Sequence, residues 1–420
     1  MTKITLRLSD IIKKPSCNVL LVDQGLSFGG ALIVLFSIAK NLGSAFNPVI
    51  ISAIKEKVAN WFETKNIQVQ SCTPGFTYVD HFKAQHHIAH YRQRSLRKLV
   101  AYFFLFYGFI KNLPYVAHIC FFIHRNDINV VHVNNSIYVV IAAAIMRRPC
   151  IWQFHGAITA HPSFLERLFK KNVKQYIAIS NYVSKSAVQF GYPARKITTL
   201  HNPVNDNFIY STKNDDEIRY KIRLSLGLKK SQLLFAIFGR VIRWKGQLEL
   251  VQAFAKIHEK LDAKLVIVGD TTEGFDNDYI NDIKAFTEVA GLDDKVIFYG
   301  FTKDVRSMYL AADIVVHASI EPEPFGLVII EAMSMGKPII ASNLGAPNEL
   351  ITHGTDGLIV SPFDTESLGQ CMLRLALNKK LQTRFIKNGL HKVKTGFLPK
   401  DYARQLGTIY QLFSKSRTKA

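Results

Sequence analysis

Hydrophobic positions along the chain follow two alternating patterns. Short runs rich in Val and Ile, bounded by turn residues, alternate with segments of helical periodicity. Continuous apolar runs are typical of strands buried in a parallel sheet, and their alternation with helices indicates βαβ units. In the first half, the pattern predicts strands over residues 18–22, 48–52, 130–133, 150–154 and 175–179.

The second half repeats the pattern, with strands predicted over 233–238, 263–268, 295–298, 314–318, 338–341 and 357–360. The proline of Leu200-His-Asn-Pro-Val and the polar stretch that follows it predict a hinge. Ligands of doubly wound sheets bind beyond the carboxyl ends of the strands, so the active site is expected in a deep cleft between two facing domains. We therefore predict an α/β fold of two doubly wound domains, 1–205 and 206–395.

The composition is that of a folded protein with two domains. The 420 residues exceed what a single core usually organises, and 48% of them are hydrophobic and 20% charged. The five cysteines are scattered and never form a C-x-x-C pair, which argues against a disulfide framework or a zinc site. No apolar stretch at the start is long enough for a signal peptide, so we expect a cytoplasmic location.

The net charge of +21 is concentrated in the first half of the chain. Residues 1–205 hold 24 Lys and Arg against 7 Asp and Glu, whereas residues 206–420 hold 29 against 25. This asymmetry predicts an anionic partner for the first domain: nucleic acid, anionic lipid headgroups or a phosphorylated acceptor. Nucleic acid ranks lowest, because the chain contains no nucleic-acid-binding motif.

The most specific motif contains two glutamates. Glu321-Pro-Glu-Pro-Phe-Gly-Leu predicts a loop and then a helix beginning near Phe325, whose first turn would offer free N–H groups to a phosphate. Glu323 lies in the loop and Glu331 within two turns of the helix start, so both carboxylates can reach one ligand. A carboxylate accepts hydrogen bonds from neighbouring hydroxyls, as on a ribose or a hexose. The alternative for either glutamate alone is a charge that balances the helix dipole.

The pair resembles the E-x7-E motif of family 4 glycosyltransferases, and the resemblance covers nearly the whole chain. It implies the GT-B fold of two facing Rossmann-like domains, with a C-terminal helix, 396–420, that crosses back to the first domain. Transfer with retention of configuration and without a protein nucleophile is implied as well. It also implies that Glu331 binds the ribose of a nucleotide-sugar and Glu323 the sugar hydroxyls. Phe325, Gly326 and Leu327 would lie beside the donor at the start of the helix.

Residues at other strand ends match the same family. The loop Phe238-Gly-Arg-Val-Ile-Arg-Trp-Lys-Gly resembles its diphosphate-binding loop, which assigns Arg240 and Lys245 to the leaving group and leaves Arg243 solvated. His155 ends a strand where the family has a histidine that contacts the donor sugar near the reacting carbon. With Glu323, these residues form the predicted catalytic set, and the other 13 histidines are assigned no function.

Weaker matches extend the predicted site. Gly29 and Gly30 resemble the family's glycine loop, which faces the reaction centre and the acceptor, with a tight strand-to-helix turn as the alternative. Asn202 is assigned to the same reaction centre, although Asn-Pro-Val replaces the usual Asn-Gly-Val-Asp. Gly300 and Phe301 match a contact with the nucleotide base, with packing as the alternative for Phe301.

No metal or other cofactor is expected. The D-x-D string at 276–278 lies in a polar loop rather than after a strand. The resemblance implies that Arg240, Lys245 and the helix N-terminus of this chain neutralise the diphosphate in place of a metal.

Residues 92–123 raise the question of a membrane. A basic cluster is followed by two apolar, aromatic-rich runs, 99–110 and 115–123. The apolar stretch is interrupted by Lys111, Asn112, Pro114 and His118. A spanning helix needs about 20 uninterrupted apolar residues, so each piece is predicted to be too short to cross. The alternatives are shallow insertion into the cytoplasmic leaflet and a buried helix pair, and the charge of the first domain favours insertion.

Together, the motifs predict a glycosyltransferase that moves a hexosyl unit from a nucleotide diphosphate sugar, with UDP favoured over GDP. The acceptor is expected to be a saccharide or a lipid-linked, phosphate-bearing molecule at the inner face of the cytoplasmic membrane, in the synthesis of a bacterial surface polysaccharide or lipopolysaccharide. The alternatives are a nucleotide-sugar epimerase of the same fold and a non-catalytic nucleotide-sugar-binding protein.

Overall fold

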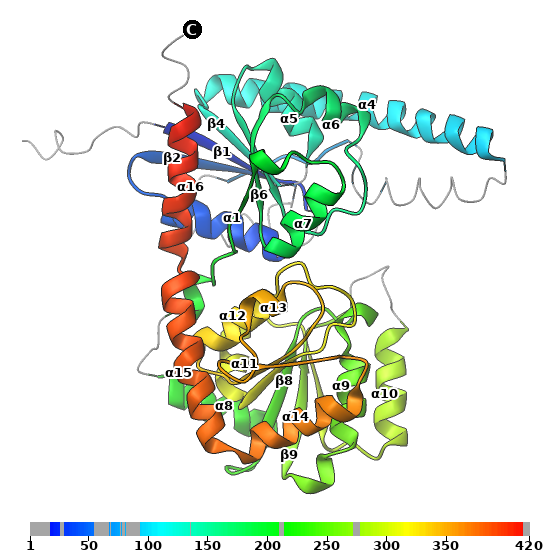
Figure 1. Ribbon diagram of the computed structural model, residues 1–420, viewed down its shortest axis with the longest axis vertical. Helices are drawn as coiled ribbons and strands as arrows, with labels where there is room; N and C mark the ends of the chain where they lie inside the picture. The colour runs from blue at the N-terminus through cyan, green and yellow to red at the C-terminus, as the bar shows by residue number, and fades with distance from the viewer. Residues whose placement is uncertain are drawn as a thin grey trace, which may run out of the picture. The chain divides into compact units, whose positions relative to one another are not determined.

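The computed structural model describes residues 17–25, 29–53, 67, 69–75, 77, 80, 93–134, 136–209, 214–271 and 278–414. The chain divides into two compact units. The first comprises Met1–Ile179, Ser184–Leu200 and Tyr402–Ala420, and the second comprises Ser180–Val183 and His201–Asp401. Each unit is built on one parallel sheet with helices packed against it (Figure 1).

The sheet of the first unit consists of β1 (Cys17–Asp23), β2 (Phe46–Ser52), β3 (Val69–Ser71), β4 (Val130–Asn134), β5 (Cys150–Phe154), β6 (Val173–Ala178) and β7 (Ile197–Thr199). Its order is β3-β2-β1-β4-β5-β6-β7, and all neighbours are parallel. The strand order reverses at β1, where Leu20 pairs with Val49 of β2 and Val131 of β4. Such a reversal leaves a crevice for ligands beyond the strand ends.

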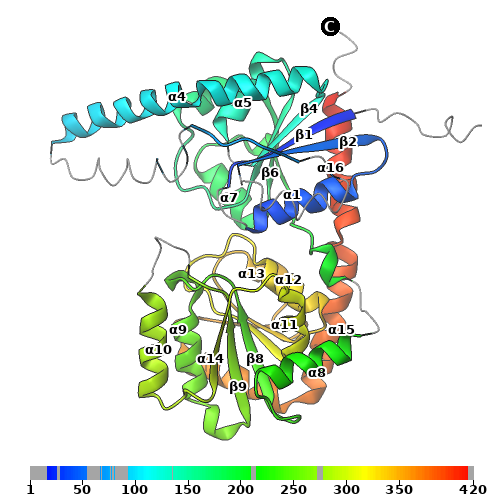
Figure 2. The ribbon, with the colours of Figure 1, turned by 180° about the vertical axis from the view of Figure 1, so that it is seen from behind.

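Helices cover both faces of this sheet. They are α1 (Gly30–Asn41), α4 (Arg94–Arg125), α5 (Ile137–Ile145), α6 (Phe164–Phe169), α7 (Asn181–Gln189) and the end of α16 (Pro399–Ser414). On one face, Leu35 of α1 and Leu406 and Tyr410 of α16 share a core with alternate residues of β1. The helices α4 and α5 pack together on the opposite face (Figures 1 and 2).

The sheet of the second unit consists of β8 (Leu233–Phe238), β9 (Ala263–Val268), β10 (Val296–Gly300), β11 (Ile314–His317), β12 (Ile339–Ser342) and β13 (Leu358–Val360). Its order is β10-β9-β8-β11-β12-β13, again all parallel, with the reversal at β8. Its helices are α8 (Asp215–Ser225), α9 (Gln247–Ala255), α10 (Tyr279–Val289), α11 (Val305–Ala311), α12 (Leu327–Ser334), α13 (Pro347–Leu350), α14 (Thr365–Leu377) and α15 (Lys379–Gly396). Phe235 and Phe254 lie in the core between β8 and α9.

The predicted α/β class and the two doubly wound sheets are confirmed. The prediction missed β3 and β7, the two edge strands of the first sheet, each of which has only three residues. In place of the predicted boundary at 395/396, the units change between Asp401 and Tyr402, inside α16. Tyr410 explains the return to the first unit, since its hydroxyl lies 2.7 Å from Nδ1 of the buried His132 in β4.

The segment predicted as two broken apolar pieces is a single helix, α4, which continues through Pro114. Asn112, expected to interrupt it, is fully buried, and its side-chain amide donates to the carbonyl of Gly108 at 2.9 Å. Beyond the proline, Val116 and Ile119 are buried. The buried side-chain amide of Asn112 thus has a hydrogen-bond partner within the helix, and the inner face of the helix is packed on both sides of Pro114. Both features allow the helix to continue through the proline.

Candidate active site

Two strand ends of the second unit converge on the carboxylate of Glu323. This residue lies in the loop between β11 and α12, and its Oε2 is 2.6 Å from Nζ of Lys245, in the short turn after β8. The same oxygen lies 3.1 Å from Nε2 of His317, the last residue of β11, and 3.2 Å from Oγ of Ser319. Because β8 and β11 are neighbours at the reversal of the sheet, the cluster occupies the crevice expected to bind ligands.

These contacts keep Glu323 ionised. The side chain is almost buried, with 10% of its surface exposed, and burial alone would raise its pKa. The charge of Lys245 and the hydrogen bond and charge of His317 outweigh burial and hold the pKa well below the usual range for glutamate. All three contacts fall on Oε2, and none of the described residues donates a hydrogen bond to Oε1. Oε1 is thus the oxygen left to accept from a ligand.

Glu331 is held in a different way. Its Oε2 accepts a hydrogen bond of 2.9 Å from the hydroxyl of Tyr309, which is fully buried and stacks on Phe238 at 3.9 Å between ring centroids. Burial raises the pKa of Glu331 to about 7, and the Tyr309 hydrogen bond offsets only part of this shift. Glu331 therefore changes charge near neutral pH, unlike Glu323.

The helix that carries Glu331 begins at Leu327, two residues later than predicted. Gly326 precedes it with φ of +97°, a left-handed conformation that glycine adopts readily. In the first turn, the N–H of Ile329 donates to the carbonyl of Gly326 at 2.9 Å, whereas the N–H groups of Leu327 and Val328 have no acceptor among the described residues and are open to an anion. Phe325 is buried against the rings of His201 and Phe397, which also contact each other, so its side chain packs the loop.

The remaining predicted residues of the second unit lie at strand ends. Arg240 follows β8 with an exposed side chain that forms no ion pair with any described residue. Gly300 ends β10 and accepts a hydrogen bond from the N–H of Gly269 at 2.9 Å. Phe301 is 66% exposed, which removes core packing as the explanation for this residue. Asn202 also belongs to this unit, and its Oδ1 is buried with no hydrogen-bond partner among the described residues.

In the first unit, His155 belongs to a chain of hydrogen bonds across β1, β4 and β5. The amide nitrogen of Asn134 donates to Asp23 at 3.1 Å, so Asn134 Oδ1 faces His155 Nε2, 3.0 Å away. Asp23 Oδ2 also accepts from the N–H of Gly25 at 3.0 Å. Burial and the nearby His132 lower the pKa of His155 to about 3. His155 is therefore neutral, with its proton on Nε2 and an open acceptor at Nδ1.

The glycine loop follows β1 in the same unit. Gly29 caps the N-terminus of α1 in an extended conformation, and Gly30 is the first residue of the helix. The loop leaves the same strand end as Asp23, the last residue of β1. The three residues before Gly29 and the first two of the D-x-D string lie outside the described part of the chain, whereas Asp278 caps α10.

Sequence reasoning missed several residues of these clusters. Among the 13 histidines to which no function was assigned, His317 contacts Glu323 through its Nε2. Like Asn134, His317 is the last residue of a buried strand. A polar residue in this position could have been used as a signal for a residue of the site. Ser319 and Tyr309 gave no such signal, since their contacts depend on how a loop and a neighbouring helix turn back.

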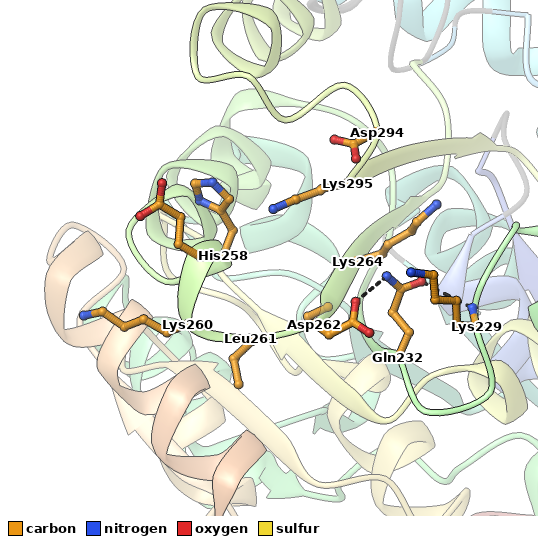
Figure 3. A pocket seen from close by; sticks show the side chains of 11 residues that line it. Lys229, Gln232, His258, Lys260, Leu261, Asp262, Lys264, Asp294 and Lys295 are labelled. Carbon is orange, nitrogen blue, oxygen red and sulfur yellow. Dashed lines mark hydrogen bonds between the residues drawn. The ribbon is translucent and has the colours of Figure 1, made fainter.

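A separate hollow of about 470 Å³ lies at the amino ends of strands of the second sheet (Figure 3). It is lined by residues that precede or begin β8, β9 and β10, among them Gln232, Asp262, Lys264 and Lys295. Gln232 donates to Asp262 at 2.7 Å, and the lysines are accompanied by acidic residues. Because Lys245 and Glu323 follow the carboxyl ends of the strands, this hollow is not part of their cluster.

Comparison with known proteins identifies both halves of the chain. Residues 219–392 match the family of glycosyl transferases group 1, and residues 57–208 match glycosyltransferase family 4. An uncharacterized glycosyltransferase of Methanocaldococcus jannaschii is 28% identical over 57% of this chain, and the match spans 60% of the relative's length. The UDP-Gal:alpha-D-GlcNAc-diphosphoundecaprenol alpha-1,3-galactosyltransferase of Escherichia coli is 26% identical over 69% of this chain and 76% of its own length.

Solved structures share the fold over nearly the whole chain. Anabaena HepE in complex with UDP-glucose has a TM-score of 0.75 with 24% identity, covering 94% of this chain and 99% of HepE. A glycosyltransferase of Rickettsia africae has a TM-score of 0.77 with 22% identity, covering 95% and 98%. The chain therefore belongs to the family 4 glycosyltransferases and has their GT-B architecture of two Rossmann-like domains.

Proposed function

We propose that the protein is a retaining hexosyltransferase that uses a nucleotide diphosphate sugar, with UDP as the favoured nucleotide, and a saccharide or lipid-linked acceptor. The observation that carries this proposal is the anchored carboxylate of Glu323, whose Oε1 stays open while Lys245 and His317 hold Oε2. Support for UDP comes from the complex of HepE with UDP-glucose and from the UDP-galactose donor in the name of the E. coli relative. Synthesis of a bacterial surface polysaccharide or lipopolysaccharide is the proposed setting, because relatives include a lipopolysaccharide core mannosyltransferase of Rhizobium meliloti.

Each part of the donor is assigned a group that suits its chemistry. Arg240, Lys245 and the open N–H groups at the start of α12 would stabilise the charge that develops on the departing diphosphate. Glu323 Oε1 would accept from sugar hydroxyls and Glu331 from the ribose. The acceptor hydroxyl would pass its proton to the departing phosphate oxygen, and no protein nucleophile is needed.

His155 suits a hydroxyl of the donor sugar rather than an anion. Because it is neutral and its Nε2 proton is directed to Asn134, Nδ1 can only accept a hydrogen bond. In the proposed complex it would accept from a hydroxyl near the reacting carbon. The backbones of Gly29 and Gly30 would face the acceptor.

The test is a product analysis with a panel of nucleotide-sugars, each incubated with and without saccharide acceptors. We expect one UDP-sugar to yield UDP and a glycoside of unchanged anomeric configuration, as judged by NMR coupling constants. An isomerised sugar or free UDP formed without any glycoside would support the epimerase instead. Binding without turnover across the panel would support the non-catalytic alternative.

Transfer should not need a metal ion, because the proposed diphosphate site already supplies cations from the protein. We therefore expect the initial rate with the preferred donor to be unchanged in excess EDTA. A loss of rate that Mg²⁺ or Mn²⁺ restores would contradict this proposal and would direct attention to the region around Asp278.

The affinity for UDP should rise between pH 6 and pH 8 because Glu331 must be ionised to accept ribose hydroxyls. With a free-enzyme pKa of about 7, the carboxylate is mostly protonated at pH 6 and mostly charged at pH 8, which predicts about tenfold tighter binding. Titration calorimetry measures this change. The variant Glu331→Gln keeps the shape of the side chain, and its affinity should follow only the titration of the UDP phosphates. Equal pH dependence in both proteins would contradict the role of Glu331.

The same ionisation has the opposite effect on folding. A carboxyl whose pKa is raised by folding binds more protons in the folded protein than in the unfolded one between about pH 4.5 and pH 7. Its contribution to stability therefore falls as the pH rises through this range. Glu331→Gln should remove that part of the pH dependence of unfolding.

We also propose that the protein works as a peripheral protein at the inner face of the cytoplasmic membrane. The excess of 24 Lys and Arg over 7 Asp and Glu in residues 1–205 supports this location, since anionic headgroups attract such a surface.

A further inference from the structure

The first half of α4 extends beyond the sheet of the first unit, as both views show (Figures 1 and 2). From Gly108 onward, one face of the helix is buried and includes Val116 and Ile119. Between Gln93 and Tyr107, none of the described side chains is buried. At a rise of about 1.5 Å per residue, the projecting part is about 20 Å long.

A continuous apolar stripe runs along the side of α4 that faces away from the unit. We call it the outer face of α4, and it consists of Leu96, Leu99, Phe103, Phe106, Ile110, Leu113 and Phe121. From Leu96 to Leu113 the spacing is three and four residues, and Phe121 follows two turns later on the same side of the helix, opposite the buried Val116 and Ile119. Leu99 and Phe106 are each 67% exposed, and Phe103 is 62% exposed. A stripe of this size on a soluble surface indicates a binding site.

By length and composition, Leu99–Arg125 is apolar enough to cross a membrane. However, the residues from Gly108 onward hold their inner face against the unit, and the buried Asn112 lies on that face. The part that projects freely is shorter than the roughly 20 residues that a bilayer requires. The stripe can therefore meet a bilayer along its side but cannot carry the helix through it.

The charges of α4 decide between a bilayer and a second copy of the chain. The helix contains five Lys and Arg and no Asp or Glu. The stripe has the spacing of a coiled-coil seam, but a second copy of the helix would add only more positive charge and no acidic partner. Aromatic side chains next to basic residues are instead typical of helices that lie in the interface of an anionic bilayer.

We propose that the outer face of α4 lies in the headgroup region of an anionic bilayer, with the helix axis parallel to the membrane. This inference deepens the proposed membrane location by assigning it to one surface. The face of the first sheet that α4 and α5 cover would then be turned toward the membrane.

Vesicle binding of the full chain tests the proposal without donor or acceptor. We expect binding to phosphatidylglycerol-containing vesicles at least tenfold tighter than to phosphatidylcholine, and weaker binding as salt increases. The double variant Phe103→Ser/Phe106→Ser should lose at least tenfold. The matched control is Phe164→Ser/Leu168→Ser on α6, in the same unit, where the two side chains are 71% and 59% exposed. This control should bind like the unchanged protein.

A second measurement reports the depth of insertion. The variant Phe106→Trp should be quenched by brominated lipids, whereas Phe164→Trp should gain no such quenching over the unchanged protein. Equal vesicle binding by the two double variants would overturn the proposal. A dimer that only Phe103→Ser/Phe106→Ser converts to a monomer, without vesicle binding, would assign the stripe to a second copy. Transfer to a saccharide acceptor is measured separately, so loss of vesicle binding with intact transfer would leave the proposed reaction standing.

Discussion

Replacement of Lys245 by alanine should lower kcat/KM by about 10³-fold and weaken the binding of UDP. The change removes a cation proposed to stabilise the departing diphosphate, and loss of one such group typically costs about 10²- to 10³-fold in rate. It also removes the strongest contact of Glu323, since the pair is only 2.6 Å apart with little exposure on either side. Without Lys245, burial should raise the pKa of Glu323, and its open oxygen would be less well positioned. Steady-state kinetics and titration calorimetry with UDP measure the two effects.

Arg243 provides the matched control, because it lies two residues away in the same short turn. Its ion pair with Asp282 joins side chains that are 55% and 45% exposed, and such surface pairs contribute about 0–1 kcal/mol. Arg243→Ala should therefore keep kcat/KM within about threefold of the unchanged enzyme. If Lys245→Ala behaves in the same way, Lys245 does not hold the leaving group.

The parts of the site that follow from strand order could be predicted from the sequence. Lys245 and Glu323 are 78 residues apart, yet each follows a continuous apolar strand, and the carboxyl ends of parallel strands meet at one edge of a sheet. The same reasoning placed His155 at a strand end. The alternation of apolar runs thus predicted both the fold and the neighbourhood of these side chains.

The parts that depend on loop geometry could not be predicted. Ser319 contacts Glu323 only because the loop after β11 turns back on itself, and the spacing of four residues does not show this. Asn112 was expected to interrupt a helix, but its amide bonds within the helix that it occupies. In both examples, the outcome depends on which partner satisfies a polar group, and a hydrophobic pattern carries no information about that partner.

Gly345 lies against the backbone of Glu323, and neither the hydrophobic pattern nor a sequence motif predicted this contact. The N–H of Glu323 donates to the carbonyl of Leu344, and the N–H of Ala346 donates to the carbonyl of Glu323, so the two segments lie side by side. A Cβ atom at position 345 would lie 2.4 Å from the carbonyl oxygen of Glu323 and 2.7 Å from its nitrogen. Any side chain there requires the backbone of Glu323 to shift.

Gly345→Ala should therefore lower both stability and activity, and Gly354→Ala separates the two causes. Both glycines have positive φ, +81° and +74°, so each alanine bears a similar backbone strain of about 1–2 kcal/mol. Only position 345 has the additional clash, because no atom lies within 4 Å of a Cβ at position 354. A displacement of about 1 Å at a reacting group can cost about 10²-fold, so we expect that loss in kcat/KM for Gly345→Ala and little change for Gly354→Ala. Urea unfolding measures the strain common to both variants. Equal kcat/KM in the two alanine variants would show that the position of Glu323 does not depend on Gly345.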